Sequence, residues 1–148
     1  MDARDLIAET LYKFMRSFDE QDWHIMRECL SHSIYCDYSS FRNEKPATKM
    51  REEYVAERKR NLSHLRTQHN ILNLSIDTET ENQIAVAKCN YIIYRFDSNY
   101  SGSRDQFYHS YGRYQFEFQR AGNTWEIISI VQTVITNDGN PRLHGGIK

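Results

Sequence analysis

The sequence has few of the residues that hold metals, phosphates or disulfide frameworks. Its three cysteines, Cys29, Cys36 and Cys89, are an odd number without CxxC spacing. This indicates reduced, small apolar residues rather than a disulfide framework or a zinc site. The histidines form no HExxH pattern, and the six glycines form no phosphate-binding loop. We therefore expect neither a metal nor a cofactor.

The chain also lacks an excess of charge of either sign. Its 19 Lys and Arg residues nearly balance its 20 Asp and Glu residues, so we expect no binding to nucleic acid or to an anionic membrane. The short basic cluster Arg58–Arg60 lies on an expected helix and is interpreted as a solvated face. No apolar run approaches the length of a membrane span, and residues 1–5 do not begin a signal peptide. We expect a soluble, cytoplasmic protein.

Tyrosine is abundant instead, with ten tyrosines beside seven phenylalanines and only two prolines. A domain of this size can bury so many phenols only where their hydroxyls find hydrogen-bond partners. A polar-lined pocket supplies such partners, and so does a subunit interface. Both interpretations remain open at this point.

The order of hydrophobic patterns predicts helices first and strands afterwards. We expect helices at 3–18, 23–30 (with Asp22 as N-cap) and about 48–61, and strands at 33–38, 65–76, 84–96, 107–119 and 125–135. A polar turn at 77–82, a loop at 97–105 and a hairpin turn at 121–123 separate the later strands. This layout predicts an α+β fold with a curved antiparallel sheet, as a single domain over 1–136 and a flexible tail at 137–148.

The strand at 107–119 alternates clearly between two faces. One face is almost wholly polar, with His109, Arg113, Gln115, Glu117 and Gln119, so the other must point inward. That inward face carries Tyr108, Ser110, Gly112, Tyr114, Phe116 and Phe118. It is hydroxyl-rich in its first half and apolar in its second, which indicates a cone with a closed tip and a polar, functional mouth.

The segment Leu65–His69 places a histidine at the start of a strand-like run, after a charged helix. A histidine at the mouth of a closed sheet is where a cofactor-free acid/base enzyme would hold its proton carrier. The alternative is a partly buried histidine whose ring bonds a backbone carbonyl. The pattern alone does not decide between them.

Five segments resemble, in order and spacing, the scytalone dehydratases of the NTF2-like, SnoaL-like superfamily. They are Phe18–Trp23, Arg27–Leu30, Asp37–Phe41, Glu52–Val55 and Leu65–His69. The dense match covers roughly residues 14–70, and the rest agrees in strand count. The resemblance implies a cone-shaped α+β barrel, usually a homotrimer, that eliminates water from a β-hydroxy ketone without metal or cofactor. We therefore expect a homo-oligomer, either a trimer or a dimer.

Three positions retain the acid/base residues of the family. Its aspartate matches Asp19, one tyrosine matches Tyr38, and its first histidine matches His69. The resemblance implies that His69 moves the proton, that Asp19 orients His69, and that Tyr38 donates a hydrogen bond to the substrate carbonyl. Without the resemblance, Asp19 reads as a loop or cap residue and Tyr38 as an ordinary strand tyrosine.

Other positions depart from the family. Its first tyrosine is replaced by Phe18, its second pocket histidine falls near Tyr94, and a serine and an asparagine fall at Gly112 and Tyr114. The resemblance therefore implies a pocket with a different lining and a substrate other than scytalone. We expect Phe18, Phe41, Tyr94 and Tyr114 to shape this pocket.

These residues predict a cofactor-independent dehydratase, a carbon–oxygen lyase that enolises a small hydroxylated ketone such as a polyketide-type secondary metabolite. A cofactor-free isomerase or cyclase of polyketide or terpenoid biosynthesis is the close alternative, because enolisation does not require loss of water. A non-catalytic ligand-binding or scaffold protein is the alternative of another class, favoured by the lost pocket residues.

Overall fold

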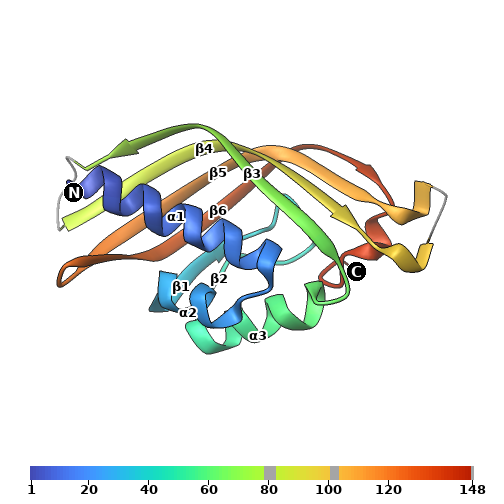
Figure 1. The fold of residues 1–148 in the computed structure, drawn as a ribbon, viewed down its shortest axis with the longest axis horizontal. Helices are drawn as coiled ribbons and strands as arrows, with labels where there is room; N and C mark the ends of the chain where they lie inside the picture. Colours follow the sequence, from blue (N-terminus) through green and yellow to red (C-terminus); the bar gives the residue numbers. More distant parts are fainter. Residues whose placement is uncertain (79–82, 101–103, 148) are drawn as a thin grey trace.

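Three α-helices lie against one curved sheet of six strands (Figure 1). The computed structural model describes residues 1–78, 83–100 and 104–147. In that part the helices are α1 (Ala3–Glu20), α2 (Trp23–Cys29) and α3 (Arg51–Leu62). The strands are β1 (Leu30–Asp37), β2 (Ala47–Met50), β3 (Arg66–Asp77), β4 (Ile84–Phe96), β5 (Tyr108–Ala121) and β6 (Thr124–Gly139). Residues 79–82 of the expected turn and 101–103 of the expected loop lie outside the described residues.

The sheet has the order β2-β1-β6-β5-β4-β3. Strands β3 to β6 form an antiparallel meander, whereas β1 pairs with β6 in parallel. The α+β fold is therefore as expected, but the sheet is mixed rather than antiparallel throughout. Two parallel strands need a long connection between them, and here the connection consists of β2, α3, β3, β4 and β5. Strand β2 was also missed, because four residues next to a helix are too few to give a strand pattern.

Helix α1 has clear signals at both ends. The Asp2 side chain accepts a hydrogen bond from the Asp5 amide at 2.9 Å, and Gln21 ends the helix in the left-handed conformation with φ 53°. Between these ends, the stripe of Ile7, Leu11 and Phe14 is buried against the sheet. Asp22 caps α2 as expected, by accepting from the Ile25 amide at 3.1 Å.

The interior has an apolar end and a polar end, as the alternation in β5 predicts. Every residue of the predicted inward face of β5 is buried. Phe116 and Phe118 lie at the apolar end, where they join Ile127 and Ile130 of β6. At the other end the buried residues include Ser110, Arg95 and His144. This polar end is the part of the interior that offers chemistry.

The last residues are not the flexible tail that the sequence suggested. Strand β6 continues to Gly139, and a 3-10 turn follows at Pro141–Leu143. Leu143 and His144 are buried, with 1% and 6% of their surfaces exposed. The amide of Gly145 donates to the carbonyl of Asn61 at the end of α3 over 3.2 Å, so the C-terminus lies beside α3 (Figure 1). The buried side chain of Leu143 and the hydrogen bond of Gly145 fix this segment in place, although its composition is that of a loop.

No helix among the described residues has both the length and the apolar character needed to cross a membrane. All three cysteines are free and buried.

Candidate active site

His69 and Asp19 form a hydrogen-bonded pair between β3 and the end of α1. The Nδ1 atom of His69 lies 2.7 Å from Oδ1 of Asp19, and the backbone amide of His69 donates to the same carboxylate at 3.0 Å. The hydroxyl of Thr67 adds a third donor at 2.9 Å. Asp19 is thus fixed by three groups of one strand, and it orients the His69 ring.

The end of α1 is tied to the start of β3, which brings this pair together. The side-chain amide of Gln21 donates to the Leu65 carbonyl at 2.9 Å and to the Ser63 carbonyl at 3.2 Å. One turn earlier, the Phe18 ring stacks on the His69 ring, with centroids 4.5 Å apart. His69 is therefore held on an edge by Asp19 and on a face by Phe18.

The environment keeps His69 neutral and poised to accept a proton. Its side chain is only 5% exposed, and burial lowers its pKa from the ordinary 6.5, although Asp19 acts in the opposite direction. Because an ionised carboxylate only accepts, the hydrogen bond places the proton of neutral His69 on Nδ1. Nε2 is then the nitrogen with a free lone pair, as a general base requires.

Tyr38 is paired with another buried tyrosine. Its hydroxyl lies 2.6 Å from the hydroxyl of Tyr54 on α3. Burial raises the pKa of both phenols above 10, so both keep their protons and one hydroxyl of the pair donates to the other. Arg58 lies over both rings, with its guanidinium carbon 4.5 Å from the Tyr54 centroid and 5.2 Å from that of Tyr38.

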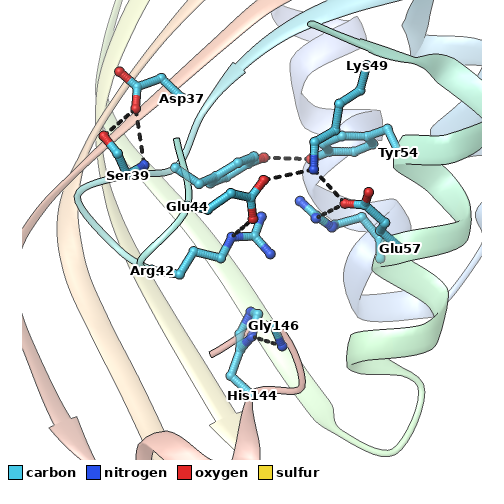
Figure 2. Close-up of polar contacts among 11 residues, drawn as sticks. Asp37, Ser39, Arg42, Glu44, Lys49, Tyr54, Glu57, His144 and Gly146 are labelled. Carbon is cyan, nitrogen blue, oxygen red and sulfur yellow. Dashed lines mark hydrogen bonds and ion pairs between the residues drawn. The ribbon is translucent and has the colours of Figure 1, made fainter. Parts of the chain in front are cut away.

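A tight turn after β1 carries two further residues to the same place. The Asp37 carboxylate accepts from the amide and hydroxyl of Ser39 at 3.1 and 2.6 Å (Figure 2). The chain then folds back, so that the amides of Phe41 and Arg42 both donate to the Tyr38 carbonyl at 3.0 Å. As a result the Arg42 guanidinium lies over the Tyr38 ring, 4.5 Å from its centroid.

These elements line a small, partly open cavity of about 30 Å³. Its lining joins residues of α1, α3, β3, β4, β5, β6, the loop after β1 and the C-terminal segment: Phe18, Tyr38, Phe41, Arg42, Arg58, Leu62, His69, Ile93, Arg95, Tyr114, Gln132 and His144. This space is the size of one or two water molecules. The wall combines apolar side chains such as Phe18 and Ile93 with the side chains of three arginines and two histidines.

Most of the residues expected in the pocket do line the cavity. His69, Tyr38, Phe18, Phe41 and Tyr114 are all part of its wall, and Asp19 contacts it through His69.

Tyr94 was wrongly expected there. Its ring packs on the outer sheet face against His109, with centroids 4.9 Å apart, while Ile93 and Arg95 point inward. A count that is off by one residue along a strand reverses the face, and this is what happened at Tyr94.

Sequence reasoning missed the cationic side of the cavity. Arg58 was interpreted as part of a solvated face, but it is 4% exposed, whereas Lys59 and Arg60 are exposed. Its i, i+4 spacing from Tyr54 was a usable signal. Arg95 follows Tyr91 and Ile93 on the inward face of β4, so alternation would have found it. Arg42 lies in a loop and has no periodic signal.

Comparisons with known proteins show the family and the fold of this chain. The family model of the SnoaL-like domain matches residues 1–131, and a search of curated protein sequences gives no match. A crystal structure of the Kfla4162 protein from Kribbella flavida superposes with a TM-score of 0.86 at 17% identity, covering 95% of each chain.

Two further solved structures are similar to this chain. A candidate scytalone dehydratase from Novosphingobium aromaticivorans has a TM-score of 0.74 at 15% identity, over 93% of this chain and 91% of its own. A hexachlorocyclohexane dehydrochlorinase has a TM-score of 0.76 at 12% identity, over 96% and 91%. Identities this low establish the shared fold alone, whereas the family match spans most of the sequence. The chain therefore belongs to the SnoaL-like domain family and has the NTF2-like α+β fold of its members.

Proposed function

We propose that this protein is a cofactor-independent lyase that dehydrates a small hydroxylated ketone by acid/base enolisation. The observation that carries the proposal is the His69–Asp19 pair, which combines a buried neutral imidazole with a carboxylate on its Nδ1. The family includes dehydratases, and one structural neighbour is named as a dehydrochlorinase, an enzyme that also eliminates a group beside a carbon–hydrogen bond. The carbon–oxygen lyase activity and the ketone substrate are our inference.

In the proposed reaction, Nε2 of His69 removes the proton α to the ketone carbonyl. The electron pair of that C–H bond forms the enolate, and the Tyr38–Tyr54 pair donates a hydrogen bond to its oxygen. Asp19 stabilises the imidazolium that has formed. The enolate then expels the β-hydroxyl, which takes the proton back from His69 and leaves as water. The product is the corresponding unsaturated ketone.

The cavity must open before a substrate binds, because about 30 Å³ holds only water. His144 belongs to the segment that follows the last strand, which, like the loop that carries Tyr38, Phe41 and Arg42, lies outside the strands and α-helices. We expect this segment to move aside when the substrate binds.

A non-catalytic ligand-binding protein is the second candidate, and the family pocket residues that are replaced at Phe18, Gly112 and Tyr114 favour it. In that case His69, Asp19 and the tyrosines form a hydrogen-bonded polar core. Isomerisation or cyclisation uses the same first proton transfer, so it differs from dehydration only in the fate of the enolate.

The decisive experiment compares the small molecules of cells that carry the wild-type gene, no gene, or the His69→Ala variant. For a general base we expect a loss of turnover of about several hundredfold, and the same precursor accumulates without the gene and with H69A. His24→Ala is the matched control, because the His24 side chain is 76% exposed and lies on α2. Near-normal turnover of the precursor by H69A would contradict the proposal.

The same comparison separates the alternatives. A product lighter than the precursor by one water indicates dehydration, and a product of equal mass indicates isomerisation or cyclisation. If the gene changes no metabolite but the purified protein retains a small molecule, the ligand-binding candidate is correct.

A further inference from the structure

Three buried arginines converge on the cavity from three different elements. Arg42 comes from the loop after β1, Arg58 from α3 and Arg95 from β4, and all three line the cavity. They are 6%, 4% and 3% exposed, respectively. Guanidinium groups keep their charge under all ordinary conditions, and burying such a charge without an anion is unfavourable. Each of the three therefore needs a partner.

Arg58 has its partners within the protein. Its Nη2 donates to Oε2 of Glu57 at 3.2 Å, and its guanidinium rests on the Tyr54 ring. Glu57 also accepts from Lys49 at 2.7 Å, and Lys49 in turn donates to Glu44 at 2.8 Å (Figure 2). Lys49 thus binds both acidic residues on this side of the site.

Arg42 is incompletely satisfied. Its Nε lies 3.5 Å from Oε2 of Glu44, but it forms no hydrogen bond. In Figure 2 the acidic residues Glu44 and Glu57 lie with Lys49 on one side of Arg42, and His144 lies on the other. Arg42 therefore shares the Glu44 carboxylate with Lys49. Its guanidinium keeps an N–H donor for a ligand in the cavity.

Arg95 has no anionic partner at all within the part of the chain that the structure describes. Its Nη1 donates to the hydroxyl of Ser110 at 2.8 Å and to the Tyr108 carbonyl at 3.5 Å. Its guanidinium carbon also lies 4.9 Å from the centre of the Phe41 ring. These neutral contacts hold its direction without balancing its charge, and burial lowers the Arg95 pKa to about 10.

No other group on the cavity wall supplies the missing negative charge. His144 is neutral, since burial and the nearby arginines lower its pKa well below 6.5. Asp19 is engaged by His69 and Thr67. The tyrosines Tyr38 and Tyr114 keep their protons, because burial raises the pKa of each well above 10. The polar end of the interior thus carries a net positive charge that faces the cavity.

We propose that the ligand of this cavity is an organic acid, and that Arg95 and Arg42 bind its carboxylate. A planar carboxylate matches the fork of a guanidinium and accepts two parallel hydrogen bonds. For the identity of the substrate, this inference rests on the proposed function: the hydroxylated ketone turned over at His69 carries a carboxylate at its other end. The arginines bind and orient it, while His69 performs the proton transfer.

The test uses acetate and acetamide, which have nearly the same shape but differ in charge. Each is titrated into the full-length protein at constant ionic strength, and the side-chain N–H signals of the arginines are followed by NMR. Acetate is expected to shift the Arg95 Nε–H signal in a saturable manner, and acetamide is not. An unchanged Arg95 signal, or equal responses to the two probes, would overturn the proposal. Equal responses would mean that the arginines bind a neutral carbonyl.

Variants locate the site. Arg95→Met is expected to weaken acetate binding by about tenfold or more, because a buried charged hydrogen bond is lost. Arg95→Lys keeps the charge but lacks the two parallel donors of a guanidinium. Its affinity for acetate should lie between those of the wild type and R95M. Arg4→Met is the control, since it removes one exposed charge on α1. If R95M does not fold, the wild-type titration alone still decides the question, because it reads the Arg95 signal directly.

Failure of this inference and failure of the proposed function give different results. Acetate binding at Arg95 without any change of metabolites in the H69A comparison supports the anion site and contradicts the lyase. A precursor that accumulates with H69A but is a neutral molecule supports the lyase and contradicts the anion site.

Discussion

At the scale of single residues, Asp19 has more hydrogen bonds than a residue that only orients a histidine requires. It accepts from the ring of His69, the backbone amide of His69 and the Thr67 hydroxyl. The same carboxylate therefore fixes the ring and joins α1 to β3. Catalysis and stability are coupled at this position.

The first prediction concerns Asp19→Asn. The amide lacks the charge and offers one acceptor oxygen instead of two, so we expect a loss of about 2 kcal/mol or more in the free energy of unfolding. We also expect His69 to lose its fixed tautomer. Urea denaturation measures the first effect, and the 15N shifts of the His69 ring measure the second. Thr67→Val is the control, because it removes one donor and leaves the Asp19–His69 bond; a shift of the ring in T67V alone would contradict the assignment.

The second prediction concerns pH and His144. Its folded-state pKa lies well below 6.5 because of burial and then Arg95, Arg42, Arg58 and His69, so the unfolded chain binds a proton that the native protein does not. Stability is therefore fully present above pH 6.5 and falls as the pH drops below that value. The slope is about 1.4 kcal/mol per pH unit for each such histidine until its folded pKa is reached.

His69 contributes with the same sign, because burial also lowers its pKa. Urea denaturation over this range should show a smaller slope for His144→Asn than for the wild type, by about 1.4 kcal/mol per unit. Asn keeps an acceptor for the Gly146 amide, which lies 3.0 Å from Nδ1 of His144. Equal slopes would mean that His144 is charged in the native protein.

Among these residues, the sequence indicates those that obey a period or a motif. His69 and Asp19 stand out because the resemblance gives both positions. Tyr114 stands out because β5 alternates strictly. Arg42 depends on a turn built by Asp37 and Ser39, and no repeating pattern marks such a turn. The sequence also does not indicate which charged residues are buried, because arginines are expected on the surface.

At the scale of elements, Gly112 allows the close approach of β5 and β6 where their register shifts. The register between the two strands shifts at Tyr111 and Gly112, and a side chain at Gly112 would meet the carbonyl of Thr133 and lie 2.7 Å from the Tyr91 hydroxyl. The resemblance places a serine of the scytalone dehydratases at this position. The backbone around Gly112 leaves no room for a serine side chain. Glycine is therefore the residue that fits the bulge at this position.

The third prediction follows from that contact. Gly112→Ala should lower the free energy of unfolding by about 2 kcal/mol or more, because backbone atoms must move to admit the methyl group. Gly122→Ala is the comparison, since its Cβ would meet no atom within 4 Å and only the left-handed φ of +62° opposes it. Its expected loss is smaller, about 1 kcal/mol. Urea denaturation of both variants provides the measurement, and equal losses would exclude the steric explanation.

Element boundaries were predictable where one face is polar, and pairing was not. The alternation of β5 and the stripe of α1 were read directly from the sequence. The parallel neighbour of β1 has no local signal, because pairing depends on the path of the remaining chain. The C-terminal segment was misjudged for a related reason. Its polar composition hides the buried side chains of Leu143 and His144.

At the scale of the whole molecule, we propose that the outer sheet face joins copies of this chain into a dimer or trimer. Tyr94 and Phe107 pack with His109 on that face, and Phe96 beside them is 42% exposed. An aromatic group on a sheet face is typical of an interface.

The fourth prediction is that the protein sediments as such an oligomer and that Phe96→Glu weakens the association. Tyr12→Glu is the matched control, since Tyr12 is 45% exposed on α1, away from this face. Sedimentation equilibrium over a range of concentrations measures both. A wild-type protein that stays monomeric at all concentrations, or a Y12E variant that dissociates as F96E does, would contradict the assignment of this face.

The parallel pairing of β1 with β6 has a consequence for how the protein is made. The ribosome releases the chain from its N-terminus, so Leu30–Asp37 emerge long before their partners at 127–131. Asp19 and His69 are separated by 50 positions and are both translated before β4, whereas Gln132 and His144 are the last residues of the cavity wall to be translated. A nascent chain that stalls within β5 leaves two strand edges open to neighbouring chains. The edge of β1 that pairs with β6 therefore stays without its partner until the last strand has been translated.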